Sequence, residues 1–140
     1  MGGRFAFFLL IPLLVIVLTG CGGVPLAGSW PGLAVVDGII YTTSTGQKVY
    51  ALGADTGTKR WEFPTEEDKI KEIFHATPAV GEGLVFVGSY SNNLYALDVD
   101  TGKQRWSFAT GGPIIANPVV SGDTVYVGSA DHRLYALEVS

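Results

Sequence analysis

Short apolar runs separated by glycine-containing turns follow one another from about residue 33 to the end of the chain. The runs Leu84-Val85-Phe86-Val87 and Val125-Tyr126-Val127 lack the apolar-polar alternation of a strand that has one face in water. Strands of this kind are covered on both faces. The pattern therefore predicts small sheets, each packed between two neighbouring sheets.

A longer phrase recurs along the same region. Residues 51–61 read ALGADTGTKRW, residues 96–106 read ALDVDTGKQRW, and residues 136–140 begin the phrase again. Tyr50, Tyr95 and Tyr135 each precede it. A period of about 40 to 45 residues is typical of a solenoid or a propeller, whose units bury their faces against one another.

Four short strands fit into each repeat. In the second repeat we expect them at about residues 77–80, 84–89, 94–98 and 104–108, with the Asp-Thr-Gly turn in the last hairpin. This predicts an all-β fold of about three four-stranded propeller blades, at residues 33–64, 76–109 and 117–140. Closed propellers have four to eight blades, so the ring is incomplete and both of its ends are expected to associate. Self-association, blades from another polypeptide and a truncated or split gene product stay open, and the last is favoured.

The recurring phrase resembles the tryptophan-docking motif of the pyrroloquinoline-quinone (PQQ) repeat superfamily. That superfamily includes quinoprotein alcohol dehydrogenases and the barrel-assembly lipoprotein of the outer membrane. The resemblance covers residues 33–140 and implies that the tryptophan of each motif packs on the next blade. Gly53 stands where Asp is usual, which is expected to weaken one turn contact. The matching positions are Ala51, Thr56, Gly57 and Trp61 in the first copy, and Ala96, Asp98, Thr101, Gly102 and Trp106 in the second.

The first 20 residues have the pattern of a secretory signal: Arg4, then an apolar stretch too short to span a bilayer comfortably. Leu18-Thr19-Gly20-Cys21 resembles the lipobox of bacterial lipoproteins, which implies lipidation of Cys21, the only cysteine. Gly22 in place of Asp favours the outer membrane if the cell is Gram-negative. An ordinary signal or an uncleaved anchor with a free thiol is the alternative.

Residues 21–32 are predicted to be a flexible tether, because they contain Gly and Pro without strand or helix periodicity. Ser29-Trp30-Pro31 within it is a candidate for the last strand of the third repeat. Between the first two repeats, residues 65–75 are predicted to form a short surface helix with Ile70, Ile73 and Phe74 on one side. It is interpreted as a solvated insertion or, alternatively, as a partner contact.

Composition and motifs give no catalytic, cofactor-binding or metal-binding residues. The chain carries 9 basic and 13 acidic side chains without a basic stripe, which argues against nucleic acid. The two Asp-Thr-Gly turns do not fit an aspartic protease, because Thr58 and Lys103 follow them and they lie in tandem repeats. His75 and His132 have no metal-pair spacing, and no cysteine pair or calcium constellation suggests a quinone cofactor.

These observations favour a membrane-anchored, non-catalytic scaffold that binds proteins in the bacterial cell envelope, on the periplasmic or extracellular side. Outer-membrane protein assembly is a possible setting. Its expected partners are the membrane, through Cys21, and envelope proteins or further blades. The alternative is a fragment or subunit of a PQQ-dependent quinoprotein dehydrogenase.

Overall fold

The computed structural model describes residues 32–44, 47–68 and 70–140. The proposed signal peptide, Cys21, the tether up to residue 31 and the Ser29-Trp30-Pro31 candidate strand lie outside these residues. The described residues form eleven strands and no helix. The all-β expectation is therefore confirmed.

The strands form three antiparallel sheets in chain order, which we call blades 1, 2 and 3. Blade 1 contains β1 (Leu33–Val36), β2 (Ile39–Ser44), β3 (Lys48–Gly53) and β4 (Lys59–Phe63). Blade 2 contains β5 (Ala79–Gly81), β6 (Leu84–Gly88), β7 (Asn93–Asp98) and β8 (Gln104–Ala109). Blade 3 contains β9 (Val119–Ser121), β10 (Thr124–Ser129) and β11 (Arg133–Glu138).

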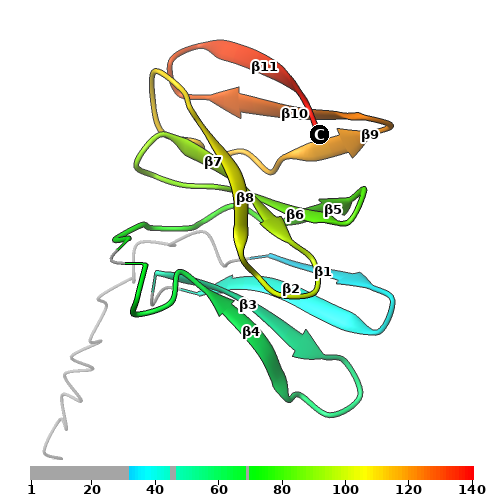
Figure 1. Ribbon diagram of the computed structural model, residues 1–140. Helices are drawn as coiled ribbons and strands as arrows, with labels where there is room; N and C mark the ends of the chain where they lie inside the picture. Colours follow the sequence, from blue (N-terminus) through cyan, green and yellow to red (C-terminus); the bar gives the residue numbers. More distant parts are fainter. Residues whose placement is uncertain (1–31, 45–46, 69) are drawn as a thin grey trace, which may run out of the picture.

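The blades stack face to face, as Figure 1 shows from blade 1 at the bottom to blade 3 at the top. Their first strands are neighbours, because β5 contacts both β1 and β9. The central hairpins share one register: Tyr41, Phe86 and Tyr126 stand opposite the first alanine of each recurring phrase. The repeat seen in the sequence is thus a repeat of sheet geometry, as in a propeller.

Blade 2 is covered on both faces. Val85, Val87 and Leu97 pack with blade 1 in one hydrophobic core, whereas Phe86 and Leu94 pack with blade 3 in a second core. Successive side chains of a strand point to opposite faces, so one apolar run supplies both cores. This confirms the prediction made from the run at residues 84–87.

The same prediction is wrong for the run at residues 125–127. Val125 and Val127 are buried against blade 2, but Tyr126 between them is 39% exposed. Its side chain points to the other face of blade 3, where the described residues place no further sheet. Of the two apolar runs, only the one in blade 2 is therefore buried on both faces of its sheet.

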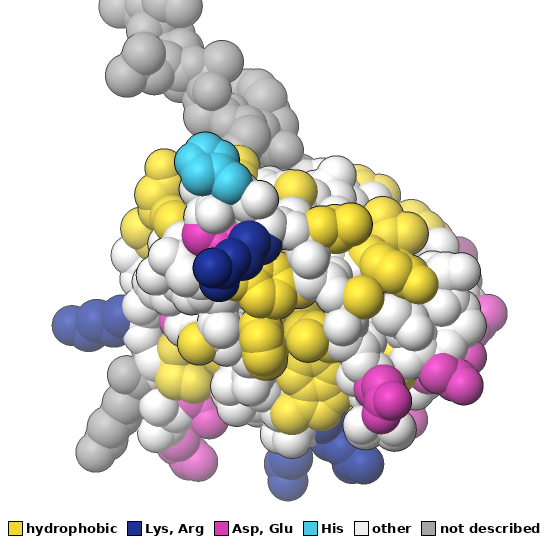
Figure 2. All heavy atoms as spheres, turned by 90° about the horizontal axis from the view of Figure 1, so that it is seen from above, with side chains coloured by type: hydrophobic (Ala, Val, Ile, Leu, Met, Phe, Trp, Pro, Cys, Tyr) yellow, Lys and Arg dark blue, Asp and Glu magenta, His cyan; other side chains and the backbone are white. Residues whose placement is uncertain are grey.

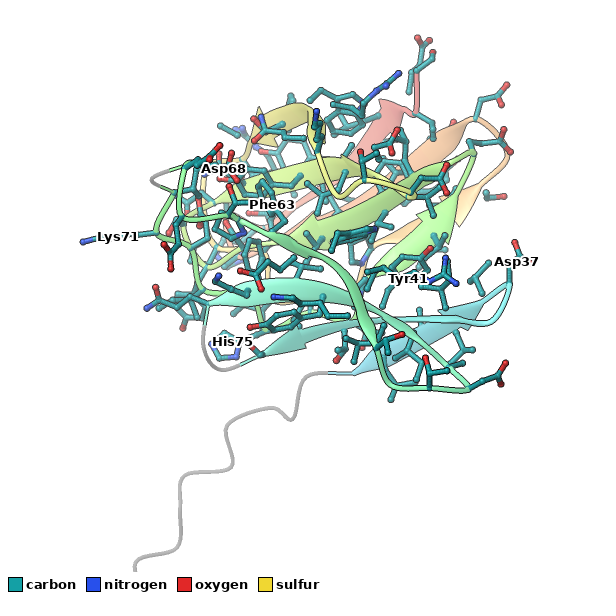
Figure 3. All side chains as sticks on the ribbon, turned by 60° about the horizontal axis from the view of Figure 1, so that its bottom comes forward. Asp37, Tyr41, Phe63, Asp68, Lys71 and His75 are labelled. Atoms are coloured by element: carbon teal, nitrogen blue, oxygen red, sulfur yellow. The ribbon has the colours of Figure 1, made fainter. Side chains whose placement is uncertain are left out.

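The predicted helix at residues 65–75 is also wrong, because its described residues form turns and extended chain. Glu72, Phe74 and Ala76 are buried, whereas Lys71, before Glu72, and Ile73, between Glu72 and Phe74, are exposed. This period of two belongs to an extended segment, not to a helix. Figure 3 places Asp68, Lys71 and His75 of this connection at one end of the blades and Asp37 at the opposite end.

Candidate functional site: the tryptophan contacts between blades

Trp61 joins blade 1 to blade 2. Its indole Nε1 donates a hydrogen bond of 2.9 Å to the backbone oxygen of Val99. The ring is buried and lies 5.9 Å from the ring of Tyr41. Ala51 stands opposite Trp61 in the ladder and is fully buried, so a small side chain leaves room for the indole on that face.

The indole of Trp61 packs against Gly102 of blade 2. A Cβ at this position would lie 2.6 Å from the Trp61 ring, and the glycine has a φ of 70°. Contact and backbone conformation thus both require the absence of a side chain. The structure brings Trp61 and Gly102 together, although they belong to different copies of the motif.

Asp98 shapes the turn that carries Gly102. Its Oδ1 accepts hydrogen bonds from the hydroxyl of Thr101 (2.8 Å) and from the backbone N–H of the same residue (3.0 Å). These bonds, the hydroxyl's first, hold the pKa of the Asp98 carboxyl below its ordinary value. Arg105 adds a weaker ion pair at 3.7 Å.

The first copy builds the same turn without an aspartate. Gly53 replaces it, and the hydroxyls of Thr56 and Thr58 bond each other at 2.7 Å. The backbone closure is unchanged, since the N–H of Gly57 bonds the oxygen of Gly53 at 2.8 Å and that of Gly102 bonds Asp98 at 2.9 Å. Gly57 is exposed, with nothing within 4 Å of the position of a Cβ.

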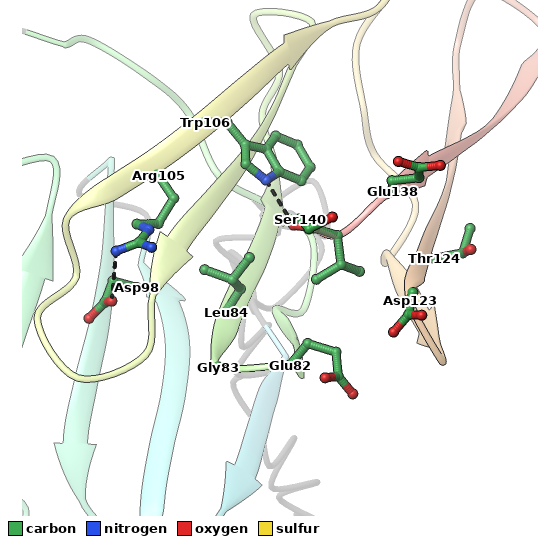
Figure 4. A pocket seen from close by; sticks show the side chains of 11 residues that line it. Glu82, Gly83, Leu84, Asp98, Arg105, Trp106, Asp123, Thr124, Glu138 and Ser140 are labelled. Atoms are coloured by element: carbon green, nitrogen blue, oxygen red, sulfur yellow. Dashed lines mark hydrogen bonds and ion pairs between the residues drawn. The ribbon is translucent and has the colours of Figure 1, made fainter.

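Trp106 makes the corresponding contact between blades 2 and 3. Its Nε1 donates to the backbone oxygen of Val139 at 3.0 Å, and Ala96 stands opposite it in the ladder. Beside the indole is an open groove of about 840 Å³ (Figure 4). Four acidic residues and one basic residue are part of its lining: Glu82, Asp98, Asp123, Glu138 and Arg105.

A tyrosine and a carboxylate meet at the opposite end of each interface. The hydroxyl of Tyr95 donates to Glu72 Oε1 at 2.5 Å, and that of Tyr135 donates to Asp131 Oδ2 at 2.6 Å. Burial, followed by the hydrogen bond to Glu72, raises the pKa of the Tyr95 hydroxyl. The hydrogen bond from Tyr135 is the main cause of a lowered pKa at Asp131.

Sequence reasoning missed both carboxylates. The only available signal was the tyrosine before each recurring phrase, since a buried hydroxyl needs a partner. The partners themselves come from unrelated places, a blade connection for Glu72 and a hairpin turn for Asp131. No repeat pattern could have found them.

The two histidines, His75 and His132, have different surroundings. His75 stacks edge to face on the ring of Tyr90, with centroids 5.6 Å apart, and His132 is an exposed turn residue with a φ of 69°. In the part of the chain that the structure describes, no three His, Cys, Asp or Glu side chains form a group suited to a metal ion. Nor do the described residues form a helix with the length and hydropathy of a membrane span.

Comparison with known proteins agrees with this architecture. A family model described as Outer membrane protein assembly factor BamB matches residues 46–140. The crystal structure of BamB from Moraxella catarrhalis is similar with a TM-score of 0.68 and 27% identity, over 77% of this chain and 34% of that chain. The chain thus corresponds to about a third of the length of that protein.

Two computationally designed proteins share the fold. Ika4 has a TM-score of 0.67 at 15% identity, over 77% of this chain and 64% of that chain. Ika8 has a TM-score of 0.65 at 16% identity, over 76% of this chain and 32% of that chain. No curated protein matches the sequence.

Proposed function

Because the chain belongs to the PQQ-repeat family described as Outer membrane protein assembly factor BamB, we propose that it is a non-catalytic scaffold of the bacterial cell envelope. It binds other envelope proteins during outer-membrane protein assembly. The match over residues 46–140 carries this proposal, since it includes both tryptophan contacts. The sites of a propeller, not its fold, decide its function.

The carboxylates at the blade interfaces have structural partners. Glu72 bonds Tyr95, Asp98 bonds Thr101 and Asp131 bonds Tyr135. These hydrogen bonds hold in place the loops that carry the carboxylates. The arrangement supports a rigid body that presents loops to partners.

The surface of the connection between blades 1 and 2 is suited to such binding. Ile73 and Tyr90 are both about half exposed, and the backbone N–H of Tyr90 bonds the oxygen of Ile73 at 2.8 Å. Aromatic and aliphatic side chains on well-fixed loops are common anchors of protein interfaces. We propose this pair as a contact for envelope proteins.

The test is photocrosslinking in living cells. A photoreactive residue replaces Tyr90 or, as a control, the exposed Thr58 in the turn between β3 and β4. We expect adducts with outer-membrane assembly proteins at position 90 and none at position 58. Deletion of the gene should also lower the amount of outer-membrane barrel proteins. Unchanged barrel proteins together with PQQ-dependent dye reduction by the full chain would instead support the dehydrogenase alternative.

Lipid anchoring is a separate part of the proposal. Cys21 in its lipobox context would carry acyl chains, and each buried methylene contributes about 0.8 kcal/mol to membrane binding. Cys21→Ala should abolish incorporation of labelled palmitate and release the chain from the outer-membrane fraction. Retention of the variant in that fraction would contradict lipidation as the anchor.

A further inference from the structure

Blades 1 and 2 each end in a strand with one open edge. In the described part of the chain, β4 and β8 have a hydrogen-bonded strand on one side only. Apolar side chains also lie exposed across the outer face of blade 3 (Figure 2). A blade face, however, is where a further blade of this fold packs, whereas stacking leaves the blade edges uncovered. An open edge can accept a strand from another polypeptide.

Two residues of β8 direct their backbone groups out of the sheet. The N–H of Thr110 bonds the oxygen of Asn92 at 2.8 Å, and the ladder between β7 and β8 continues from this pair. Hydrogen-bonded and non-bonded pairs alternate along an antiparallel ladder. Ser107 and Ala109 therefore stand in non-bonded pairs, and their N–H and C=O groups point away from β7. Both residues are exposed, so these donors and acceptors are accessible.

The equivalent edge of blade 1 is protected. Glu62 and Pro64 stand at the positions that correspond to Ser107 and Ala109. Two lysines form ion pairs with the carboxylate of Glu62, and Pro64 has no N–H to donate. Charged side chains and proline are common means of preventing strand addition at a sheet edge. Blade 2 has neither at these two positions, so its edge is open where that of blade 1 is blocked.

The side chains of β8 define the kind of strand that fits this edge. Trp106 packs on the core shared with blade 3, and on the same face the ring of Phe108 lies 5.5 Å from that of Tyr135. Ser107 and Ala109 point to the other face. An added strand would continue both layers, with apolar residues beside the aromatic rings and polar or small residues beside Ser107 and Ala109. The edge therefore fits an extended strand with alternating apolar and polar side chains.

We propose that the outer edge of β8 binds an extended strand of an outer-membrane barrel protein that has not yet folded, by antiparallel strand addition. This inference rests on the proposed function in outer-membrane protein assembly. Strands of outer-membrane barrels alternate apolar and polar side chains, as the two layers of β8 require. Main-chain hydrogen bonds supply the affinity in strand addition, so one edge can accept barrel strands of different sequence.

The pairing determines which backbone groups of the bound strand are used. Residues that stand directly opposite each other in an antiparallel pair have their side chains on the same face. The polar residues of the bound strand therefore stand opposite Ser107 and Ala109, and their N–H groups bond β8. The N–H groups of its apolar residues point away from the blade.

The first experiment measures binding of a labelled peptide to the full-length chain in detergent, by fluorescence anisotropy against a detergent blank. The peptide has the alternating pattern and the length of a barrel strand, about ten residues. N-methylation of its polar positions should abolish binding, whereas N-methylation of its apolar positions should leave binding unchanged. A peptide of the same composition without the alternation should not bind. Equal binding of the two methylated peptides, or binding of the peptide without alternation, would overturn the proposal.

The second experiment changes the edge itself. Ala109→Pro gives blade 2 the residue that blade 1 has at Pro64 and removes one donor, whereas Ala109→Val keeps that donor. We expect Ala109→Pro to weaken peptide binding about tenfold and Ala109→Val to bind as the wild type does. In the wild type, the peptide should slow hydrogen exchange at the amides of Ser107 and Ala109 and leave that of Glu62 unchanged. Equal affinities of the two folded variants, or no slowing at β8, would contradict the site.

Thermal unfolding compares the folding of the two variants, and the methylated peptides test the edge in the wild type if Ala109→Pro does not fold. A dimer that forms without peptide and is absent in Ala109→Pro would assign the edge to a second copy and overturn the proposal. Loss of barrel proteins on gene deletion without peptide binding would overturn the edge site and leave the proposed function in place. Peptide binding with unchanged barrel proteins would instead overturn both the proposed function and barrel proteins as the occupant.

Discussion

At the scale of single residues, the two turn glycines separate backbone strain from contact with tryptophan. Gly57 and Gly102 have φ values of 66° and 70°, but only Gly102 faces an indole. Gly57→Ala should cost about 1 to 2 kcal/mol of unfolding free energy from the left-handed backbone alone. Gly102→Ala should cost a further 1 to 3 kcal/mol or so, because the ring must move. Equal losses in chemical denaturation would show that the Trp61 contact adds no stability.

The Thr101 hydroxyl is the largest single contributor to the lowered pKa of Asp98 in the second turn, and so to its acid sensitivity. The lowered pKa of Asp98, caused chiefly by Thr101, means that the ionised carboxylate stabilises the fold above about pH 4. This stabilisation is lost as the pH falls through the folded pKa. Thr101→Val should raise the pKa of Asp98 toward its ordinary value of 3.8 in an NMR titration.

Asp131 is the internal control for that titration. Its pKa is lowered chiefly by Tyr135 in another turn, so it should not respond to Thr101→Val. If Asp98 titrates the same in both proteins, the backbone N–H groups of the turn, and not the hydroxyl, hold the carboxylate ionised.

At the scale of the element, Glu72 anchors the extended connection between blades 1 and 2. Glu72→Ala leaves the buried hydroxyl of Tyr95 without its acceptor, which costs about 1 to 3 kcal/mol. The connection should then open more often, and trypsin should cut after the exposed Lys71 faster than in the wild type.

Glu72→Gln is the matched control, because it keeps the Oε1 acceptor for Tyr95 and for Asn93. Its cleavage rate should stay near that of the wild type. If Glu72→Ala is also cut at the wild-type rate, the anchor of the connection is elsewhere, with the buried Phe74 the next candidate.

The strands of the blades could be predicted from the sequence, but this connection could not. The expected strands at residues 84–89 and 104–108 differ by one residue from β6 and β8, because local turn residues and apolar runs fix them. In residues 65–75 the acids and apolar residues also fit a helix. The burial of Glu72 on Tyr95, a contact between distant segments, decides for extended chain. Likewise, the motif located Trp61 but not its acceptor, the backbone oxygen of Val99.

At the scale of the whole molecule, the three blades share a register but differ in what covers them. β2, β6 and β10 each have a hydrogen-bonded strand on both sides. Their backbone environments are therefore matched, and among the sheets that the structure describes only blade 2 has a neighbouring sheet on both faces. A difference in local stability between β2, β6 and β10 thus reflects the packing between blades, and not the hydrogen bonds within each sheet.

Hydrogen exchange can measure that difference. In dilute protein, amides of β6 should exchange most slowly, because opening blade 2 exposes two cores, whereas opening blade 1 or blade 3 exposes one. Equal protection of β2, β6 and β10 would show that the blades open together, and the middle blade would then have no special stability.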